Sequence, residues 1–325
     1  MIKSDGVARD LLKKSGIQEV LDLDITEVAI NQCGKIFFDR GNGWESKIEE
    51  RCNFDICKRL AVALSVLSNS LKPISASNPI ASVILPGGER GQVIIPPAVE
   101  DNCISFTFRK PSTTRFELSD YTNSGRFSSY LDSSNSLEKN NKINEELKKL
   151  KDEKKIEEFF KLAVTSNKNI LIVGGTGSGK TTVMKALVDL YPKNERIFTI
   201  EDVHEIDLPK HSNHVHLFYS ESGLTPQRII ESCMRMKPDH ILLAELRGAE
   251  SFYFLEALNT GHGGAITTIH ANDCISAFSR LADLVKQSDI GKTLDYDYIL
   301  NMVKKSIDVV CFFKNTYLKE LYFNK

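Results

Sequence analysis

One eight-residue stretch constrains the fold more than any other part of this sequence. Residues 174–181 read Gly-Gly-Thr-Gly-Ser-Gly-Lys-Thr, a full match to the pattern G-x-x-x-x-G-K-[ST]. An apolar run at 170–173 precedes the match, and a helical pattern at 181–191 follows it as far as Pro192. A buried strand, a glycine-rich turn and a helix in this order are typical of an α/β fold whose loop surrounds a phosphate group.

The residue types in this loop indicate how a nucleoside triphosphate would be held. Glycines allow successive backbone N–H groups to converge on phosphate oxygens, and the new helix adds its positive N-terminal end. Lys180 would neutralise the β- and γ-phosphates, and the Thr181 hydroxyl would hold Mg²⁺. The expected nucleotide-binding residues are Gly175, Thr176, Gly177, Ser178, Gly179, Lys180, Thr181 and Thr182.

Strands and helices alternate after residue 169, which predicts a mainly parallel sheet covered on both faces. Thr225 is a good N-cap and Pro226 takes the first position of one such helix. Strands are expected at 170–173, 196–200 and 240–244, and helices at 181–191, 225–236, 251–258 and 274–285. Because the carboxyl ends of parallel strands share one edge of a sheet, the residues that follow them should lie beside the phosphate loop.

Carboxylates follow two of the expected strands. Glu245 ends an apolar run, where it could order Mg²⁺ or polarise the attacking water, or simply cap the next turn. Glu201, Asp202 and Glu205 lie close together after another strand, a concentration of like charge that needs a metal or arginines nearby. Asp202 and Glu245, with Thr181, are the candidate Mg²⁺ ligands, and Glu201, Glu205 and Glu245 are catalytic candidates.

A histidine ends a third segment of the same kind. Residues 261–271 form a glycine-rich turn that leads into a strand ending on His270. A histidine at a strand end is often structural, but this one should reach the phosphate edge, where it could sense the γ-phosphate through a hydrogen bond. His270 therefore joins Lys180 and the carboxylates as a catalytic candidate.

The first 118 residues differ in kind from the rest. Phe106 and Phe108 alternate with polar residues in a half-buried strand that directs Arg109 to its polar face. A similar strand at 92–95 follows the turn Gly-Gly-Glu-Arg, which ends on Arg90. This segment is predicted to be a smaller α+β domain.

A polar region separates the two parts. Serine, asparagine and charged residues dominate 119–141, which predicts a linker. Ile143, Leu147 and Leu150 then recur at helical spacing among acid and base pairs, and we expect an exposed or edge helix that acts as a solvated spacer.

The composition limits the possible classes of protein. Lys and Arg total 42 against 43 Asp and Glu, so a net charge of −1 gives no global attraction for nucleic acid or anionic lipid. No apolar run approaches the roughly 18 residues of a spanning helix, and the charged N-terminus does not fit a signal peptide, so a cytoplasmic location is expected. Seven cysteines without a C-x-x-C pair are expected to be reduced thiols, with Cys52 and Cys57 as the one pair of interest.

Four segments in this order resemble the secretion ATPase superfamily, the hexameric motors of type II secretion, type IV pili and type IV secretion. They are the phosphate loop at 174–181, an aspartate box at 199–205, a Walker B region at 241–245 and a histidine box at 261–271. The resemblance implies a RecA-like P-loop ATPase domain at 157–325, a PAS-like N-terminal domain at 1–118, and a linker with a charged helix at 119–156.

The type IV secretion traffic ATPases (VirB-type) are the most similar branch. The chain lacks the four-cysteine insert of type II secretion motors and the arginine-containing motif of pilus retraction motors. A motor of a type IV pilus or of type II secretion stays an alternative, as does a nucleotide-gated assembly platform with slow hydrolysis.

The resemblance also implies cofactors, partners and a place in the cell. These are ATP and Mg²⁺, a homohexamer, inner-membrane channel proteins, other secretion ATPases and membrane lipid, with the protein peripheral on the cytoplasmic face of a bacterial inner membrane. The motor would power substrate translocation or pilus assembly in a type IV secretion or DNA-uptake system, and the substrate, protein or DNA, is left open. Arg90 and Arg109 are expected to clamp the nucleotide from the N-terminal domain.

Overall fold

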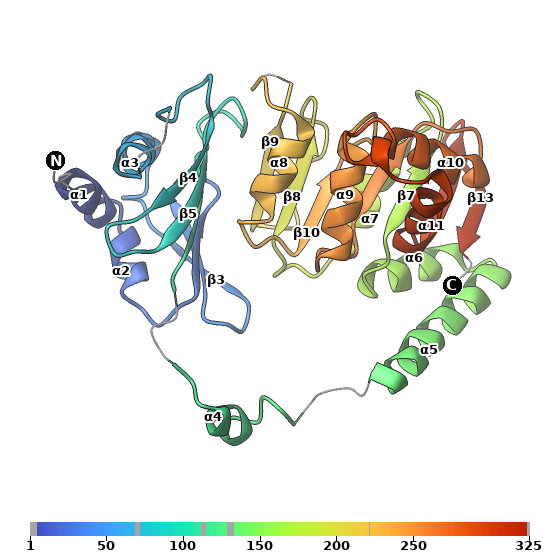
Figure 1. The fold of residues 1–325 in the computed structure, drawn as a ribbon, viewed down its shortest axis with the longest axis horizontal. Helices are drawn as coiled ribbons and strands as arrows, with labels where there is room; N and C mark the ends of the chain where they lie inside the picture. The colour runs from blue at the N-terminus through green and yellow to red at the C-terminus, as the bar shows by residue number, and fades with distance from the viewer. Residues whose placement is uncertain (1–4, 69–71, 112–114, 129–132, 221, 324–325) are drawn as a thin grey trace.

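The computed structural model describes residues 5–68, 72–111, 115–128, 133–220 and 222–323, without the side chains of 133–141. An N-terminal domain and a larger C-terminal domain lie side by side, and a linker joins them along one side of the molecule (Figure 1). No helix in these ranges is long and apolar enough to cross a bilayer.

The N-terminal domain is a six-stranded antiparallel sheet in the order β3-β2-β1-β6-β5-β4. Its strands are β1 (Glu27–Ile30), β2 (Lys35–Asp39), β3 (Trp44–Ile48), β4 (Ile80–Ile84), β5 (Arg90–Ile94) and β6 (Ser105–Arg109). Helices α1 (Gly6–Lys14), α2 (Ile17–Leu21) and α3 (Phe54–Leu67) cover the face that carries Phe106 and Phe108. The structure thus shows an α+β domain, with the two expected strands at β5 and β6.

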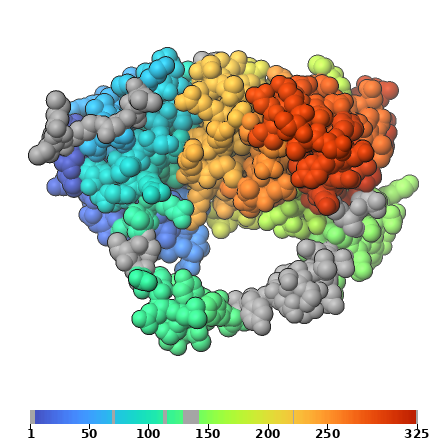
Figure 2. Space-filling view, in the orientation of Figure 1, coloured from blue at the N-terminus to red at the C-terminus, as the bar shows by residue number. Residues whose placement is uncertain are grey.

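The linker contains two helices in its described parts, α4 (Leu118–Asn123) and α5 (Ser133–Asp152). Helix α4 lies apart from both domains in the ribbon and in the space-filling view (Figures 1 and 2). Helix α5 is different, because Leu147 is fully buried and Ile143 and Leu150 pack against the same core cluster as Phe159. The expectation of a solvated spacer is therefore wrong for the second half of α5, whose apolar stripe is covered by the C-terminal domain.

The C-terminal domain contains a parallel sheet with one antiparallel strand. Its strands are β7 (Ile170–Val173), β8 (Ile197–Glu201), β9 (His214–Phe218), β10 (His240–Leu243), β11 (Ile266–Ile269), β12 (Val309–Lys314) and β13 (Tyr317–Phe323). They form the segments β10-β8-β9 and β11-β7-β12-β13, and only the pair β12–β13 is antiparallel. The Leu246 N–H donates to the Thr268 carbonyl at 2.9 Å, which joins the two segments where β10 and β11 end.

Helices cover both faces of this sheet, as the alternation of patterns predicts. They are α6 (Ile156–Thr165), α7 (Lys180–Val188), α8 (Pro226–Cys233), α9 (Glu250–Asn259), α10 (Cys274–Val285) and α11 (Tyr296–Ser306), with a 3-10 turn at Gly291–Thr293. The Thr225 hydroxyl accepts a hydrogen bond from the Arg228 N–H, so the expected N-cap is confirmed. Helix α8 ends three residues before Met236, earlier than expected, and β9, α11, β12 and β13 had no expected counterpart.

The other face of the N-terminal sheet lies against β8, β9 and α8. Gln92 donates to the Ser232 hydroxyl at 2.9 Å, and Lys237 lies 2.6 Å from the Asp39 carboxylate. Polar side chains on this face are consequently buried, for example Thr107 at 1% exposure. The alternating pattern of β6 predicted a half-buried strand, but the second domain covers its polar side as well.

Candidate nucleotide site

The loop between β7 and α7 has the backbone conformation that its glycines allow. Gly174 has φ 159° and Gly179 has φ 87°, both in the region that favours glycine. A Cβ atom on Gly174 would lie 2.4 Å from the Ser178 Oγ and 2.5 Å from the Phe313 carbonyl, so a larger residue cannot fit. A Cβ on Gly175 or Gly177 would meet nothing within 4 Å, which leaves the outer face of the loop open to a ligand.

Lys180 lies inside this loop at the start of α7. Its Nζ donates to the carbonyls of Gly174 at 2.9 Å and Gly175 at 3.0 Å. Burial lowers the pKa of Lys180, and the carboxylate of Glu245 opposes that shift. The Ser178 Oγ is buried and has no hydrogen-bond partner among the described residues. A cation held by neutral carbonyls, an orphaned hydroxyl and an open glycine face fit the phosphates of a nucleotide.

A chain of charged groups lies at the carboxyl ends of β8, β10 and β11. The Glu245 Oε1 lies 2.7 Å from His270 Nε2, and its Oε2 lies 2.7 Å from Arg247 Nε. Arg247 also reaches Asp202, at 3.1 Å. The hydrogen bond that Arg247 donates to Glu245 raises the pKa of Arg247, so this guanidinium stays charged. The structure thus brings together Glu245, His270 and Asp202 at one edge, through Arg247.

A cavity of about 320 Å³ connects this chain with the phosphate loop. Gly175, His270, Ala271, Asn272, Ser276 and Arg280 line it. Ser276 and Arg280 are four residues apart on α10, so they share the helix face opposite the apolar stripe. That spacing is the one sequence signal that could have distinguished Arg280 from the other arginines.

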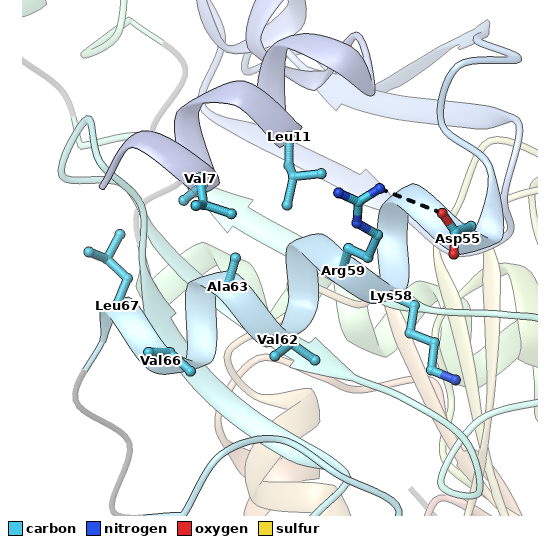
Figure 3. Close-up of a pocket in the computed structure, with 10 residues that line it drawn as sticks. Val7, Leu11, Asp55, Lys58, Arg59, Val62, Ala63, Val66 and Leu67 are labelled. Atoms are coloured by element: carbon cyan, nitrogen blue, oxygen red, sulfur yellow. Dashed lines mark ion pairs between the residues drawn. The ribbon is translucent and has the colours of Figure 1, made fainter. Parts of the chain in front are cut away.

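A larger cavity lies elsewhere, on the N-terminal domain. This groove of about 770 Å³ runs between α1 and α3, where Val7 and Leu11 face Val62, Ala63 and Val66 (Figure 3). None of the motif residues lines it, so it does not contribute to the nucleotide site.

Glu201 and Glu205 do not join the chain of charged groups. Glu201 is fully buried and accepts hydrogen bonds from the Thr199 hydroxyl at 2.6 Å and from the N–H groups of Glu205 and Ile206 at 2.8 and 2.9 Å. Burial acts to raise the pKa of Glu201, but the nearby His216 and the hydrogen bonds from Thr199 and these N–H groups outweigh it and lower the pKa. In this geometry Glu201 fixes the loop that presents Asp202, and the Glu205 side chain is exposed.

Arg90 and Arg109 lie far from the phosphate loop of their own chain. They are paired across β5 and β6, and Arg109 Nε lies 3.7 Å from the Glu27 carboxylate. Two residues before Arg109, Thr107 accepts a hydrogen bond from Arg196, at the amino end of β8. The phosphate loop follows the carboxyl end of β7, so the two arginines and the loop lie at opposite edges of the sheet. The expected clamp is not formed within one subunit.

A phosphate loop after one parallel strand and an acid after a strand of the neighbouring segment define a RecA-like P-loop ATPase domain, here combined with a second domain. The chain belongs to the type II/IV secretion system protein family, whose sequence profile matches residues 136–314. The family resemblance and the α/β fold class expected from the sequence are both confirmed.

Several relatives agree with this assignment over nearly the whole chain. Type IV secretion system protein VirB11 of Brucella suis is 42% identical over 296 residues, covering 89% of this chain and 81% of that protein. VirB11 of Bartonella henselae is 39% identical, covering 95% and 90%. The crystal structure of the VirB11 ATPase from Brucella suis, in complex with sulphate, superimposes with a TM-score of 0.90 at 38% identity over 98% of this chain and 95% of that one.

Proposed function

We propose that this protein hydrolyses ATP to ADP and phosphate, with Mg²⁺, as the motor subunit of a bacterial type IV secretion system. The observation that carries the proposal is the pairing of Glu245 with His270, 2.7 Å apart, where His270 lines the same cavity as Gly175 of the phosphate loop. The similarity to type IV secretion ATPases over nine-tenths of the chain supports it.

Each residue of the site has a specific part in the reaction. Lys180 exchanges its carbonyl partners for the β- and γ-phosphate oxygens, and Ser178 donates its free hydroxyl to the same group. Glu245 accepts a hydrogen bond from the attacking water and orients it, while His270 keeps that carboxylate in place. Thr181 and Asp202 offer oxygen ligands for Mg²⁺, which supplies charge neutralisation between the phosphates when bound.

The position of Arg90 and Arg109 supports a ring in which neighbouring subunits share each nucleotide. Both lie at the edge of the sheet opposite their own phosphate loop, and Arg109 is 77% exposed. An exposed arginine on one side and an open phosphate site on the other suit a head-to-tail contact that closes into a ring. We therefore place these arginines on the nucleotide of the adjacent subunit in a homohexamer.

The remaining elements of the proposal rest on the resemblance to the secretion ATPase superfamily alone. The ring would act on the cytoplasmic face of the inner membrane, in contact with channel proteins, other secretion ATPases and membrane lipid. Nucleotide binding and release would move the two domains and drive substrate translocation or pilus assembly.

Replacing Lys180 tests the enzymatic proposal. Lys180→Ala removes the only side-chain cation that the structure places inside the phosphate loop, among the described residues, so ATP turnover should fall by about 100-fold or more. Lys185→Ala, one turn further along α7 and paired with Asp207, is the matched control and should retain turnover. Equal turnover of wild type and Lys180→Ala would refute the mechanism, whereas a wild type that turns over only slowly, even with membrane lipid, would favour an assembly platform.

A further inference from the structure

Three potential metal ligands from separate segments meet at the contact between the two domains. Glu100 belongs to the loop between β5 and β6, His204 follows β8, and His216 lies in β9. One ligand atom from each of these residues lies within 4.8 Å of the other two. None of them has a part in the proposed ATP reaction.

The backbone carries Glu100 to this place. Val99 forms an isolated bridge with Leu217, and the Phe218 N–H donates to the Ala98 carbonyl at 3.0 Å. The loop of the N-terminal domain is thus attached to the edge of β9, next to His216. The Glu100 Oε1 then lies 3.8 Å from His204 Nδ1.

Hydrogen bonds set the tautomer of His204. Its Nε2 lies 3.2 Å from the Ile206 carbonyl, which can only accept, so Nε2 carries the proton. The neutral ring therefore directs the lone pair of Nδ1 toward the carboxylate of Glu100. Two acceptors that face each other require a proton or a cation between them.

The tautomer of His216 follows in the same way. The Thr199 hydroxyl gives its proton to Glu201 at 2.6 Å, so at 2.8 Å it must accept from His216 Nδ1. The lone pair of His216 is then on Nε2. Metal-binding histidines typically donate their second N–H to a carbonyl, a carboxylate or a similar acceptor, and both rings have this arrangement.

The neighbouring His214 has no ring nitrogen available for a metal ion. His214 stacks near His216 with ring centroids 4.8 Å apart, but both of its nitrogens are engaged, with the His211 carbonyl and the Gln32 amide. Glu201 is likewise fully hydrogen-bonded. The cluster therefore offers three ligands and one solvent-facing side, since Glu100 and His204 are 32% and 41% exposed.

We propose that Glu100, His204 and His216 form a binding site for a zinc-class divalent cation between the N-terminal domain and the loop after β8. Two imidazoles and one carboxylate suit Zn²⁺ with a water in the fourth position, whereas Mg²⁺ prefers oxygen ligands. Bonds of 2.0–2.2 Å place tetrahedral ligands about 3.4 Å apart, so the three ligand atoms, which lie within 4.8 Å of one another, need to approach by at most about 1.4 Å. Bound metal would fix the N-terminal domain to the loop that presents Asp202.

Metal binding can be measured on the full-length protein without nucleotide or Mg²⁺, in a phosphine reductant. Equilibrium dialysis against Zn²⁺, followed by elemental analysis, should give one tightly held ion per chain. Glu100→Gln and His204→Ala should each weaken that binding by about tenfold or more, and Co²⁺ in place of Zn²⁺ should give the visible bands of a four-coordinate site. Both side chains are partly exposed, so the variants should fold, and His216, which is buried, is left unchanged.

Controls separate this site from others on the chain. Glu89→Gln, at a partly exposed position just after a turn, and His270→Ala at the nucleotide site should keep the zinc affinity of the wild type. Zn²⁺ should also slow amide hydrogen exchange in residues 98–104 and 202–207 of the wild type but not of His204→Ala. The proposal is overturned if the wild type holds no zinc at about 100 µM, or if Glu100→Gln and His204→Ala bind as tightly as the wild type.

Discussion

The two edges of the C-terminal sheet use charged residues in opposite ways. At the carboxyl edge, Glu245 pairs with His270 and Arg247, whose side chains are 46% and 57% exposed, so a ligand can replace those partners. At the amino edge, Arg196 is fully buried between the domains, near the carboxylates of Asp239 and Glu27. Exposed pairs cost little to exchange, whereas a buried charge fixes its surroundings at a large desolvation cost. The first edge suits chemistry, and the second suits the attachment of a domain.

The largest effect on the carboxyl edge should follow the loss of one charge at Glu245. Glu245→Gln keeps the shape but cannot hold the attacking water as a carboxylate does, so turnover should fall by about 100-fold. Nucleotide affinity should change little, since Lys180 and the loop are intact. Glu256→Gln is a matched control on α9, with an exposed carboxylate. Single-turnover measurements with ATP check this, and unchanged turnover would remove Glu245 from the mechanism.

A smaller loss of ATP turnover should follow Arg109→Ala. If Arg109 acts on the neighbouring subunit's nucleotide, turnover should fall by about tenfold or more although its own phosphate loop is untouched. Mixing Arg109→Ala chains with Lys180→Ala chains should restore activity, because some interfaces then combine an intact loop with an intact arginine. Random 1:1 assembly predicts recovery of about a quarter of wild-type sites. No recovery on mixing would mean that both residues act within one chain.

The amino edge should respond in stability rather than in turnover. The Arg196 guanidinium donates to Asn213 at 2.7 Å and to Thr107 at 3.1 Å and lies over the ring of Trp44. Arg196→Ala should lower the free energy of unfolding by about 3 kcal/mol, because it leaves a void and removes the buried hydrogen bonds to Asn213 and Thr107. Arg196→Met should lower the free energy of unfolding by less than Arg196→Ala does, since burial already disfavours the charge and lowers the pKa of Arg196 to about 9.

Denaturant unfolding of both variants measures these costs. Arg59→Ala on the exposed side of α3 is the control and should change stability by less than about 0.5 kcal/mol. If Arg196→Ala is as stable as this control, the buried guanidinium does not hold the domains together.

The difference between the edges also explains what the sequence could predict. The phosphate loop, the N-cap at Thr225 and the strand that ends on His270 are local patterns, and the structure has all of them in place. The burial of Leu147 could not be predicted, because a solvated helix and a packed helix can both carry a three-residue apolar stripe among charged residues.

The contacts at the amino edge could not be predicted from the sequence for a similar reason. Arg196 looks like an exposed residue at the start of a strand, and non-local contacts, such as the one with Thr107 89 positions away, bury it. Strand β9 contains two histidines among three apolar residues, and its pairing with β8 is likewise set by non-local contacts. The position of Arg90 and Arg109 relative to the phosphate loop depends on how the domains pack, which no local spacing encodes.

The smallest expected effect is a change in the pH dependence of stability, and it comes from Glu27 at the amino edge. Burial raises the pKa of Glu27 to about 7, although Lys237 and Arg109 oppose the shift. Because the folded-state pKa lies above the unfolded value near 4.5, the folded state binds more protons between these values. The stability from this group is therefore complete below about pH 4.5 and is lost as the pH rises to about 7.

Glu27→Gln removes that proton linkage and keeps the shape of the side chain. At pH 8 the variant should be more stable than the wild type by about 1–3 kcal/mol, and the difference should shrink toward pH 4.5. Glu50→Gln, an exposed glutamate on the same domain, should leave the pH dependence of the wild type unchanged. Unfolding curves at intervals across this range check the slope. A Glu27→Gln variant that loses stability at pH 8 would show that the carboxylate is charged and paired with Arg109. The amino edge would then hold a charged ion pair, as the carboxyl edge does, and the two edges would differ less than their burial suggests.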